Sequence, residues 1–173
     1  MRTAIFLLIG VILSGSTIGV AAVENDCPTD ALAALNTIFS GQMTILDLEG
    51  RTQANQRVRE THRVTSCYEY TAKIQYQDND GKITREQEFS GTWDGNGKQF
   101  KIFGANIKGT FRILKANTYF VNFDTRFPTG PASCDELISV TNQGKALYRT
   151  LHCFSGGTGG PALGTRAVQG LRQ

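Results

Sequence analysis

The sequence lacks the motifs by which common catalytic and cofactor-binding families are identified. It contains no Gly-x-Ser-x-Gly nucleophile motif, no Gly-x-Gly-x-x-Gly or Walker phosphate loop, no His-Glu-x-x-His zinc motif and no EF-hand loop. Its four cysteines and two histidines form no Cys-x-x-Cys pair and no Cys/His cluster, so their spacing does not favour a metal site. We therefore expect no cofactor and no metal, and the sequence predicts no catalytic residue.

Strong charge of one sign is also missing. The formal net charge is only +3 over 173 residues, and it becomes +2 without Arg2, the one charged residue among the first 22. A nucleic-acid-binding surface needs a strongly basic face. No apolar run after residue 22 reaches the about 20 residues that span a bilayer. The sequence thus predicts neither a nucleic-acid partner nor a membrane span.

The first 22 residues have the pattern of a secretory signal peptide. Arg2 is followed by an apolar run from Ala4 to Leu13, and residues 20–22 are short side chains that fit a cleavage site. Cys27 follows two acidic residues and an asparagine rather than the small-residue motif that precedes a lipid-modified cysteine. We therefore predict a signal peptide over residues 1–22 and an exported protein, periplasmic or extracellular.

Four cysteines in an exported chain predict two disulfides. If residues 143–144 form the loop of a hairpin, the numbers of opposed residues sum to 287, and Cys134 lies opposite Cys153. Opposed residues of an antiparallel pair lie about 4.5–5.5 Å apart at Cα, within the range of a disulfide. By elimination, Cys27 is then predicted to pair with Cys67.

One short helix is predicted before a series of strands. Apolar residues from Leu32 to Phe39 have helical spacing, Thr29 fits an N-cap, and Gly41 fits the helix end. Beyond it, Tyr68 to Tyr76 alternates between apolar and polar residues, which is typical of a strand. The predicted strands cover residues 43–49, 57–65, 68–76, 83–93, 99–103, 110–115, 118–124, 134–141 and 146–153.

Successive hairpins of this kind favour a mainly β protein with an antiparallel meander. Such a meander closes into a barrel because closure removes exposed strand edges. The alternative is an α+β fold, in which a curled half-barrel packs on the helix. Residues 23–154 are predicted to form a single β-rich domain. Residues 155–173 contain six glycines and few apolar residues, so they are predicted to be a disordered tail.

A short motif agrees with the barrel. Gly91-Thr92-Trp93 resembles the Gly-x-Trp signature of lipocalins and related calycin barrels. In those proteins the motif lies on the first strand, whereas here it lies in the middle of the chain. The resemblance implies a calycin-like (lipocalin-like) barrel, and no binding residue is carried over from it.

The first candidate site is an aromatic face on one predicted hairpin. If residues 80–81 form the loop of this hairpin, the numbers of two opposed residues sum to 161. Tyr68 then faces Trp93, and Tyr76 faces Arg85. By the same register Tyr70 faces Gly91, and Gln87 also lies on this face. A dry core tolerates an arginine and a glutamine badly unless they are paired. The pattern predicts a ligand pocket, and the alternative is a Tyr76–Arg85 stack at the rim of an ordinary core. The predicted ligand-binding residues are Tyr68, Tyr70, Tyr76, Arg85 and Trp93.

A second candidate is the pair Glu60 and His62, which point to the same side of a predicted strand. Such a pair could hold a polar group of a ligand, and the alternative is a partly buried histidine.

The other face of this strand carries Arg57, Arg59 and Arg63. These arginines could bind an anionic partner or a lipid headgroup, and the alternative is a solvated face.

A third candidate is Asp135, which the register of the last hairpin places opposite His152. A carboxylate and a histidine are two parts of a catalytic triad, but the sequence offers no nucleophile motif beside them. The alternative is a cross-strand ion pair on the surface.

Together these patterns favour an exported, non-catalytic protein that binds a small hydrophobic or amphipathic ligand, including a lipid. One alternative is an envelope protein-interaction module, such as an inhibitor or a structural subunit. Another is a lipid binder similar to lipoprotein carriers. The least favoured hypothesis is a hydrolase or isomerase that uses His62 or His152.

Overall fold

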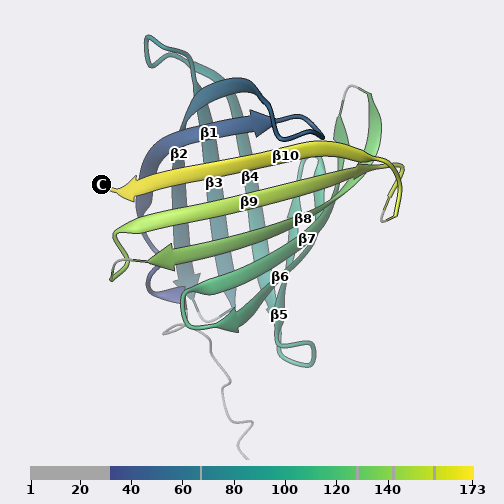
Figure 1. Cartoon of the computed structure of the whole chain (residues 1–173). Helices are drawn as coiled ribbons and strands as arrows, with labels where there is room; N and C mark the ends of the chain where they lie inside the picture. The colour runs from purple at the N-terminus through teal and green to yellow at the C-terminus, as the bar shows by residue number, and fades with distance from the viewer. Residues whose placement is uncertain (1–31, 67, 128, 142, 158) are drawn as a thin grey trace, which may run out of the picture.

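The structure is a closed antiparallel β-barrel of ten strands (Figure 1). The computed structural model describes residues 32–173 except residues 67, 128, 142 and 158. The strands are β1 (Ile38–Leu46), β2 (Thr52–Ser66), β3 (Glu69–Gln77), β4 (Ile83–Asp94), β5 (Gln99–Gly104), β6 (Ile107–Lys115), β7 (Thr118–Phe127), β8 (Gly130–Thr141), β9 (Ala146–Ser155) and β10 (Ala162–Arg172). Each strand pairs with the next, and β1 closes the barrel by pairing with β10. The predicted barrel is confirmed, and the half-barrel alternative is not what forms.

Strand β3 shows how the sequence pattern becomes a barrel wall. Tyr70, Ala72, Ile74 and Tyr76 are buried, while the residues between them face outwards and are partly exposed. Successive side chains of a strand point to opposite faces, so the apolar set of β3 lies in the barrel interior. The same alternation in neighbouring strands fills one common core.

The predicted register of the β3–β4 hairpin is confirmed, but its turn is longer than two residues. Tyr76 pairs with Arg85 as predicted. The turn runs from Asp78 to Lys82, and the Asp78 carboxylate accepts hydrogen bonds from the backbone N–H groups two and four residues later, at 3.1 and 2.8 Å. Gly81 takes a φ of 81°, which residues with a side chain rarely adopt. The register shifts beside this turn, where Thr84 of β4 is one extra, bulged residue.

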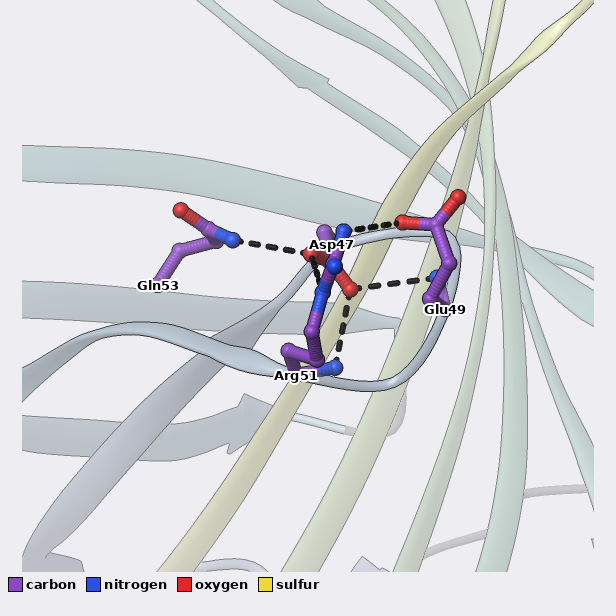
Figure 2. A network of polar contacts seen from close by, with 4 residues as sticks. All are labelled: Asp47, Glu49, Arg51 and Gln53. Atoms are coloured by element: carbon purple, nitrogen blue, oxygen red, sulfur yellow. Dashed lines mark hydrogen bonds and ion pairs between the residues drawn. The ribbon is translucent and has the colours of Figure 1, made fainter.

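The β1–β2 turn is built in the same way (Figure 2). Asp47 Oδ1 accepts hydrogen bonds from the backbone N–H groups of Glu49 (3.1 Å) and Arg51 (2.8 Å). Asp47 Oδ2 accepts two more, from Arg51 Nε at 2.8 Å and Gln53 Nε2 at 2.9 Å. Desolvation acts to raise the pKa of Asp47, but these hydrogen bonds outweigh it and bring the pKa below its ordinary value. A carboxylate therefore fixes each of these two turns, which lie at the same end of the barrel.

The prediction of a disordered tail is wrong for residues 162–172, which form β10. This strand pairs with β9 on one side and with β1 on the other. Its glycines suit the position, because Gly41 of β1 faces Gly170 so closely that a Cβ on Gly41 would lie 1.8 Å from the carbonyl oxygen of Gln169. Backbone pairing on both edges therefore holds a segment whose composition alone predicts disorder.

The predicted N-terminal helix is wrong from residue 38 onwards. Ile38 begins β1, and Gly41 lies inside that strand rather than at a helix end. Residues 32–37 form a turn in which the carbonyl of Leu32 accepts hydrogen bonds from the N–H groups of Leu35 (2.9 Å) and Asn36 (3.2 Å). The apolar residues from 38 onwards are buried by strand pairing, which overrides their helical spacing.

One predicted disulfide is confirmed. Cys134 of β8 and Cys153 of β9 are directly opposed, with their Cα atoms 4.1 Å apart, and they are bonded. The other predicted pair, Cys27 with Cys67, lies outside the described residues, as does the signal peptide predicted over residues 1–22. In the part of the chain that the structure describes, no helix has the length and hydropathy needed to cross a membrane.

The two ends of the barrel differ in what fills them. At one end, here called the closed end, the turn of residues 32–37 buries Leu32 and Leu35 completely in the core. The backbone N–H of His62 donates to the carbonyl of Thr37 at 2.9 Å and so ties this turn to β2. The opposite end, here called the open end, is where β1, β3, β5, β7 and β9 finish, and residues near the ends of these strands line a cavity.

Candidate functional site

The cavity at the open end is lined by both apolar and polar residues. Its apolar wall comes mainly from strands β3 to β7 and includes Ile74, Phe89, Ile102, Ile107, Val121 and Phe123. Its polar groups come from β3, β4, β7, β8, β9 and β10, and they include Tyr76, Arg85, Gln87, Glu136, Arg149 and Arg166. Apolar walls with a few polar groups are typical of small-molecule sites.

The cavity is narrow. The space between its lining atoms is about 500 Å³ when the opening to solvent is included. Only about 40 Å³ of it can hold the centres of water-sized molecules. A single water needs about 10–15 Å³ by this measure, so the space suits a small ligand and not a bulky one.

Two arginines stand at the mouth of this cavity, each against an aromatic ring. The guanidinium carbon of Arg85 lies 5.1 Å from the ring centre of Tyr76, and that of Arg166 lies 5.3 Å from the ring centre of Phe127. Burial lowers the pKa of Arg166, and the positive charges of Arg85 and Arg149 lower it further. The charges of the two other arginines therefore disfavour the charged form of Arg166.

Deeper in the barrel, Arg149 lies between two buried carboxylates. Its Nε is 3.0 Å from Glu136 Oε1, and its outer nitrogen is 3.4 Å from Glu60 Oε1. All three side chains are almost fully buried. Neither Arg149 Nε nor Glu60 Oε1 has a hydrogen bond of good geometry among the described residues, so these contacts are ion pairs without well-aligned donors. Burial acts against the charge of Arg149, but the two carboxylates outweigh it and raise the pKa of its guanidinium.

The pKa values of the two carboxyl groups are shifted in opposite directions. Burial raises the pKa of Glu136, and the nearby charge of Glu60 raises it further, against the opposing effect of Arg149. Burial also acts to raise the pKa of Glu60, but Arg149 and the hydrogen bond with His62 outweigh it, and the pKa is lowered. Glu60 is therefore the carboxylate that stays ionised most readily.

His62 connects this ion cluster to the aromatic core. Its Nε2 lies 3.1 Å from Glu60 Oε2 and its Nδ1 lies 2.7 Å from the hydroxyl of Tyr70. An ionised Glu60 only accepts hydrogen bonds, so the His62 proton is placed on Nε2. Burial raises the pKa of Tyr70 well above its ordinary value, and so does the charge of Glu60, so the Tyr70 hydroxyl keeps its proton and donates to Nδ1.

The structure brings together only part of the predicted ligand site. Tyr76 and Arg85 line the cavity with Gln87, whose Oε1 accepts a hydrogen bond from the Tyr76 hydroxyl at 2.7 Å. The other three predicted residues lie elsewhere. Tyr70 is buried among the aromatic rings of the core, Trp93 packs against Phe100 with ring centres 5.0 Å apart, and Tyr68 is half exposed.

The sequence reasoning missed the residues that β8, β9 and β10 supply. The register of the β8–β9 hairpin places Glu136 and Arg149 on the same inward face as the cysteine pair, so that hairpin held a usable signal. Arg166 had no such signal, because the composition of its segment predicts disorder and its pairing with β9 includes a register shift. Its contribution to the cavity depends on the closure of the barrel.

The other two candidates do not line the cavity. Asp135 and His152 are opposed as predicted, but Asp135 accepts a hydrogen bond from Asn122 and His152 Nδ1 contacts the hydroxyl of Thr165. The three arginines of β2 lie on the outer face of the barrel. Among the described residues, no three His, Cys, Asp or Glu side chains are grouped in a way that could hold a metal ion.

Comparisons with known proteins bear on the fold and on no activity. No family model and no curated protein matches the chain. The chain is similar to the crystal structure of Rv2717c from M. tuberculosis, with a TM-score of 0.56 and 16% identity over 84% of this chain and 96% of that chain. It also matches a de novo designed fluorescence-activating β-barrel (TM-score 0.43, 13% identity, 83% and 98% covered) and EF1p2_mFAP2b bound to DFHBI (TM-score 0.45, 14% identity, 84% and 98% covered). At such identities the likeness to Rv2717c shows a shared barrel fold alone.

Proposed function

We propose that this protein is a non-catalytic binding protein whose barrel takes up a small, slender amphipathic molecule through the open end. The observation that carries the proposal is the cavity, which combines an apolar wall with guanidinium, phenol and amide groups. Buried apolar surface supplies the affinity of such sites, and a few polar groups orient the ligand. The narrow space favours a single alkyl chain or one aromatic ring.

The proposal includes export of the protein. A disulfide between Cys134 and Cys153 supports it, because such bonds persist in oxidising compartments. The predicted signal peptide over residues 1–22 points the same way.

The experiment is an NMR titration of the ¹⁵N-labelled protein with octan-1-ol, a slender ligand without charge. We expect saturable shifts of amide signals in β5, β6 and β7, which form the apolar wall. Each CH₂ added between hexan-1-ol and octan-1-ol should tighten binding about fourfold, since a buried CH₂ contributes about 0.8 kcal/mol. Fluorescence of Trp93 is not a suitable readout, because this side chain does not line the cavity.

A matched pair of variants on β6 locates the binding. Ile107 lines the cavity, and Leu114 lies on the same strand with 56% of its surface exposed. Ile107→Trp should fill the cavity and abolish the saturable shifts, whereas Leu114→Trp should leave them unchanged. If the wild-type protein shows no saturable shift with any of these alcohols, the proposal fails, and the protein-interaction module becomes the better hypothesis.

A further inference from the structure

The two arginines at the cavity mouth differ from the other charged groups of the barrel interior. Arg149 lies within ion-pair distance of two carboxylates. In contrast, no carboxylate of the described residues lies within ion-pair distance of Arg85 or Arg166. Each of these two arginines instead makes a cation–π contact with an aromatic ring. A cation–π contact attracts a guanidinium group without neutralising its charge.

The charges around the cavity therefore do not balance. Three guanidinium groups line it, and the two carboxylates deep in the barrel, Glu136 and Glu60, both contact Arg149. The negative charge is thus concentrated at the deepest arginine, and the positive charge of Arg85 and Arg166 remains at the mouth. Arg166 is mostly buried, and burial together with the other two arginines lowers its pKa, so an anion placed beside it would relieve this repulsion.

We propose that the mouth of the cavity is a subsite for the anionic headgroup of the ligand, held between the guanidinium groups of Arg166 and Arg85. The apolar part of the ligand then lies along Ile102, Ile107 and Phe123. Guanidinium groups bind carboxylates and phosphates in a two-pronged manner through parallel N–H groups. The ligand class is accordingly a slender amphiphile with one carboxylate or phosphate group. This inference rests on the proposed function, and it adds the sign of the headgroup's charge and the position of the headgroup in the cavity.

The test compares ligands that share one chain and differ in the headgroup. Octanoate, octyl phosphate, octan-1-ol and octylammonium are titrated into the wild-type protein at pH 7, with NMR as the readout. Octanoate or octyl phosphate should bind about tenfold or more tightly than octan-1-ol, because a hydrogen-bonded ion pair in a partly buried site adds to the apolar contribution. Octylammonium should bind most weakly. Whichever anion binds more tightly identifies the headgroup as a carboxylate or a phosphate ester.

Three variants assign the effect to residues. Arg166→Met and Arg85→Met keep the length and apolar stem of the side chain and remove its charge, and Arg57→Met on the outer face of β2 is the matched control. The double variant of Arg85 and Arg166 should lose the preference for the anions and keep the affinity for octan-1-ol within about twofold. The control should change neither affinity.

The outcomes separate the two proposals. Equal binding of octanoate, octyl phosphate and octan-1-ol to the wild-type protein overturns the headgroup subsite and leaves the proposed function standing. The subsite is also overturned if the double variant weakens anions and alcohol alike. If none of the four ligands binds, the proposed function fails, and the headgroup subsite fails with it.

Discussion

The closed end and the open end of this barrel are formed by the same strands, yet their interiors differ in composition and packing. At the closed end, Tyr70, Phe111 and Tyr119 stack with ring centres 5.1 and 5.4 Å apart, and all three are fully buried. At the open end, β4 and β10 each contribute one arginine, Arg85 and Arg166, to the lining of a cavity. One end is therefore filled by buried aromatic side chains, and the other keeps space and charge. We expect the closed end to contribute more to the stability of the fold, and the proposed function places the ligand at the open end.

The buried ion cluster marks the boundary between the two ends. Glu60 and His62 contact the aromatic core through Tyr70, while Glu136 and Arg149 line the cavity. Burial of charge is unfavourable unless the groups are paired. We therefore expect the paired charges of this cluster to affect the free energy of unfolding in the way that the residues of the closed end do. We do not expect this of the arginines at the mouth.

The largest difference in the free energy of unfolding is expected between variants of two arginines, Arg149 and Arg166. Arg149→Met should lower the free energy of unfolding by about 3–5 kcal/mol, because it leaves two buried carboxyl groups without their positive partner. Arg166→Met should change it by less than about 0.5 kcal/mol or raise it, because this guanidinium has no described carboxylate partner. Urea unfolding followed by circular dichroism measures both values. Equal losses in the two variants would contradict the division between the ends.

A smaller difference in the free energy of unfolding is expected between variants of two leucines, Leu35 and Leu151. Leu35→Ala removes a fully buried side chain of the closed end and should cost about 2–5 kcal/mol, because a cavity forms in a dense core. Leu151→Ala removes a partly buried side chain that already borders the cavity of the open end, so its cost should be lower. The same unfolding measurement applies. A higher cost for Leu151→Ala would mean that the open end is as tightly packed as the closed end.

Two tyrosine hydroxyls provide a finer comparison. Tyr70→Phe removes the donor to His62 Nδ1 and leaves that nitrogen buried and unpaired, so it should cost about 1–3 kcal/mol. Tyr76→Phe removes the hydroxyl that donates to Gln87 at the open end, where the amide lies beside the cavity and can be hydrated. Its cost should stay below about 1 kcal/mol. If Tyr76→Phe costs more than Tyr70→Phe, the polar groups of the mouth are part of the core.

The smallest effect is expected from pH, because the two buried carboxyl groups act in opposite directions. The raised pKa of Glu136 contributes stability that is present below its ordinary value of 4.5 and is lost as the pH rises through the raised pKa. The lowered pKa of Glu60 contributes stability that is present above 4.5 and is lost as the pH falls through the lowered pKa. The two contributions partly cancel in the wild-type protein.

Glu136→Gln should remove only the first contribution. The free energy of unfolding of this variant, measured from pH 4 to pH 7, should no longer fall on the alkaline side of 4.5, while the loss towards acid pH due to Glu60 should remain. If the variant and the wild-type protein show the same pH dependence, Glu136 does not titrate as its surroundings indicate.

Local pairing within hairpins could be predicted from the sequence. The opposition of Cys134 and Cys153 and the pairing of Tyr76 with Arg85 follow from a turn signal and the alternation of side chains. This reasoning also placed Tyr76, Arg85 and Gln87, which line the cavity, on one inward face. It could not tell which inward positions reach the cavity, because Tyr70 and Tyr76 share that face and only their distance from the closed end separates them.

The wrong predictions concern segments whose partners are distant in the sequence. Residues 162–172 look disordered by composition, and residues 38–41 look helical by spacing, yet each belongs to a strand that pairs with the other as well as with its neighbour in the sequence. Composition and spacing report local preferences, which tertiary pairing overrides.

The sequence by itself determined the strands of the middle of the chain, their hairpin register and one disulfide, because these depend on residues that are neighbours or one turn apart. Only the tertiary structure decided that β1 and β10 join, that Leu32 and Leu35 close one end, and that Arg166 and Arg85 line one cavity at the other. The physical reason is that closing a barrel depends on contacts across nearly the whole described chain, whose favourable energy appears only when all ten strands are in place.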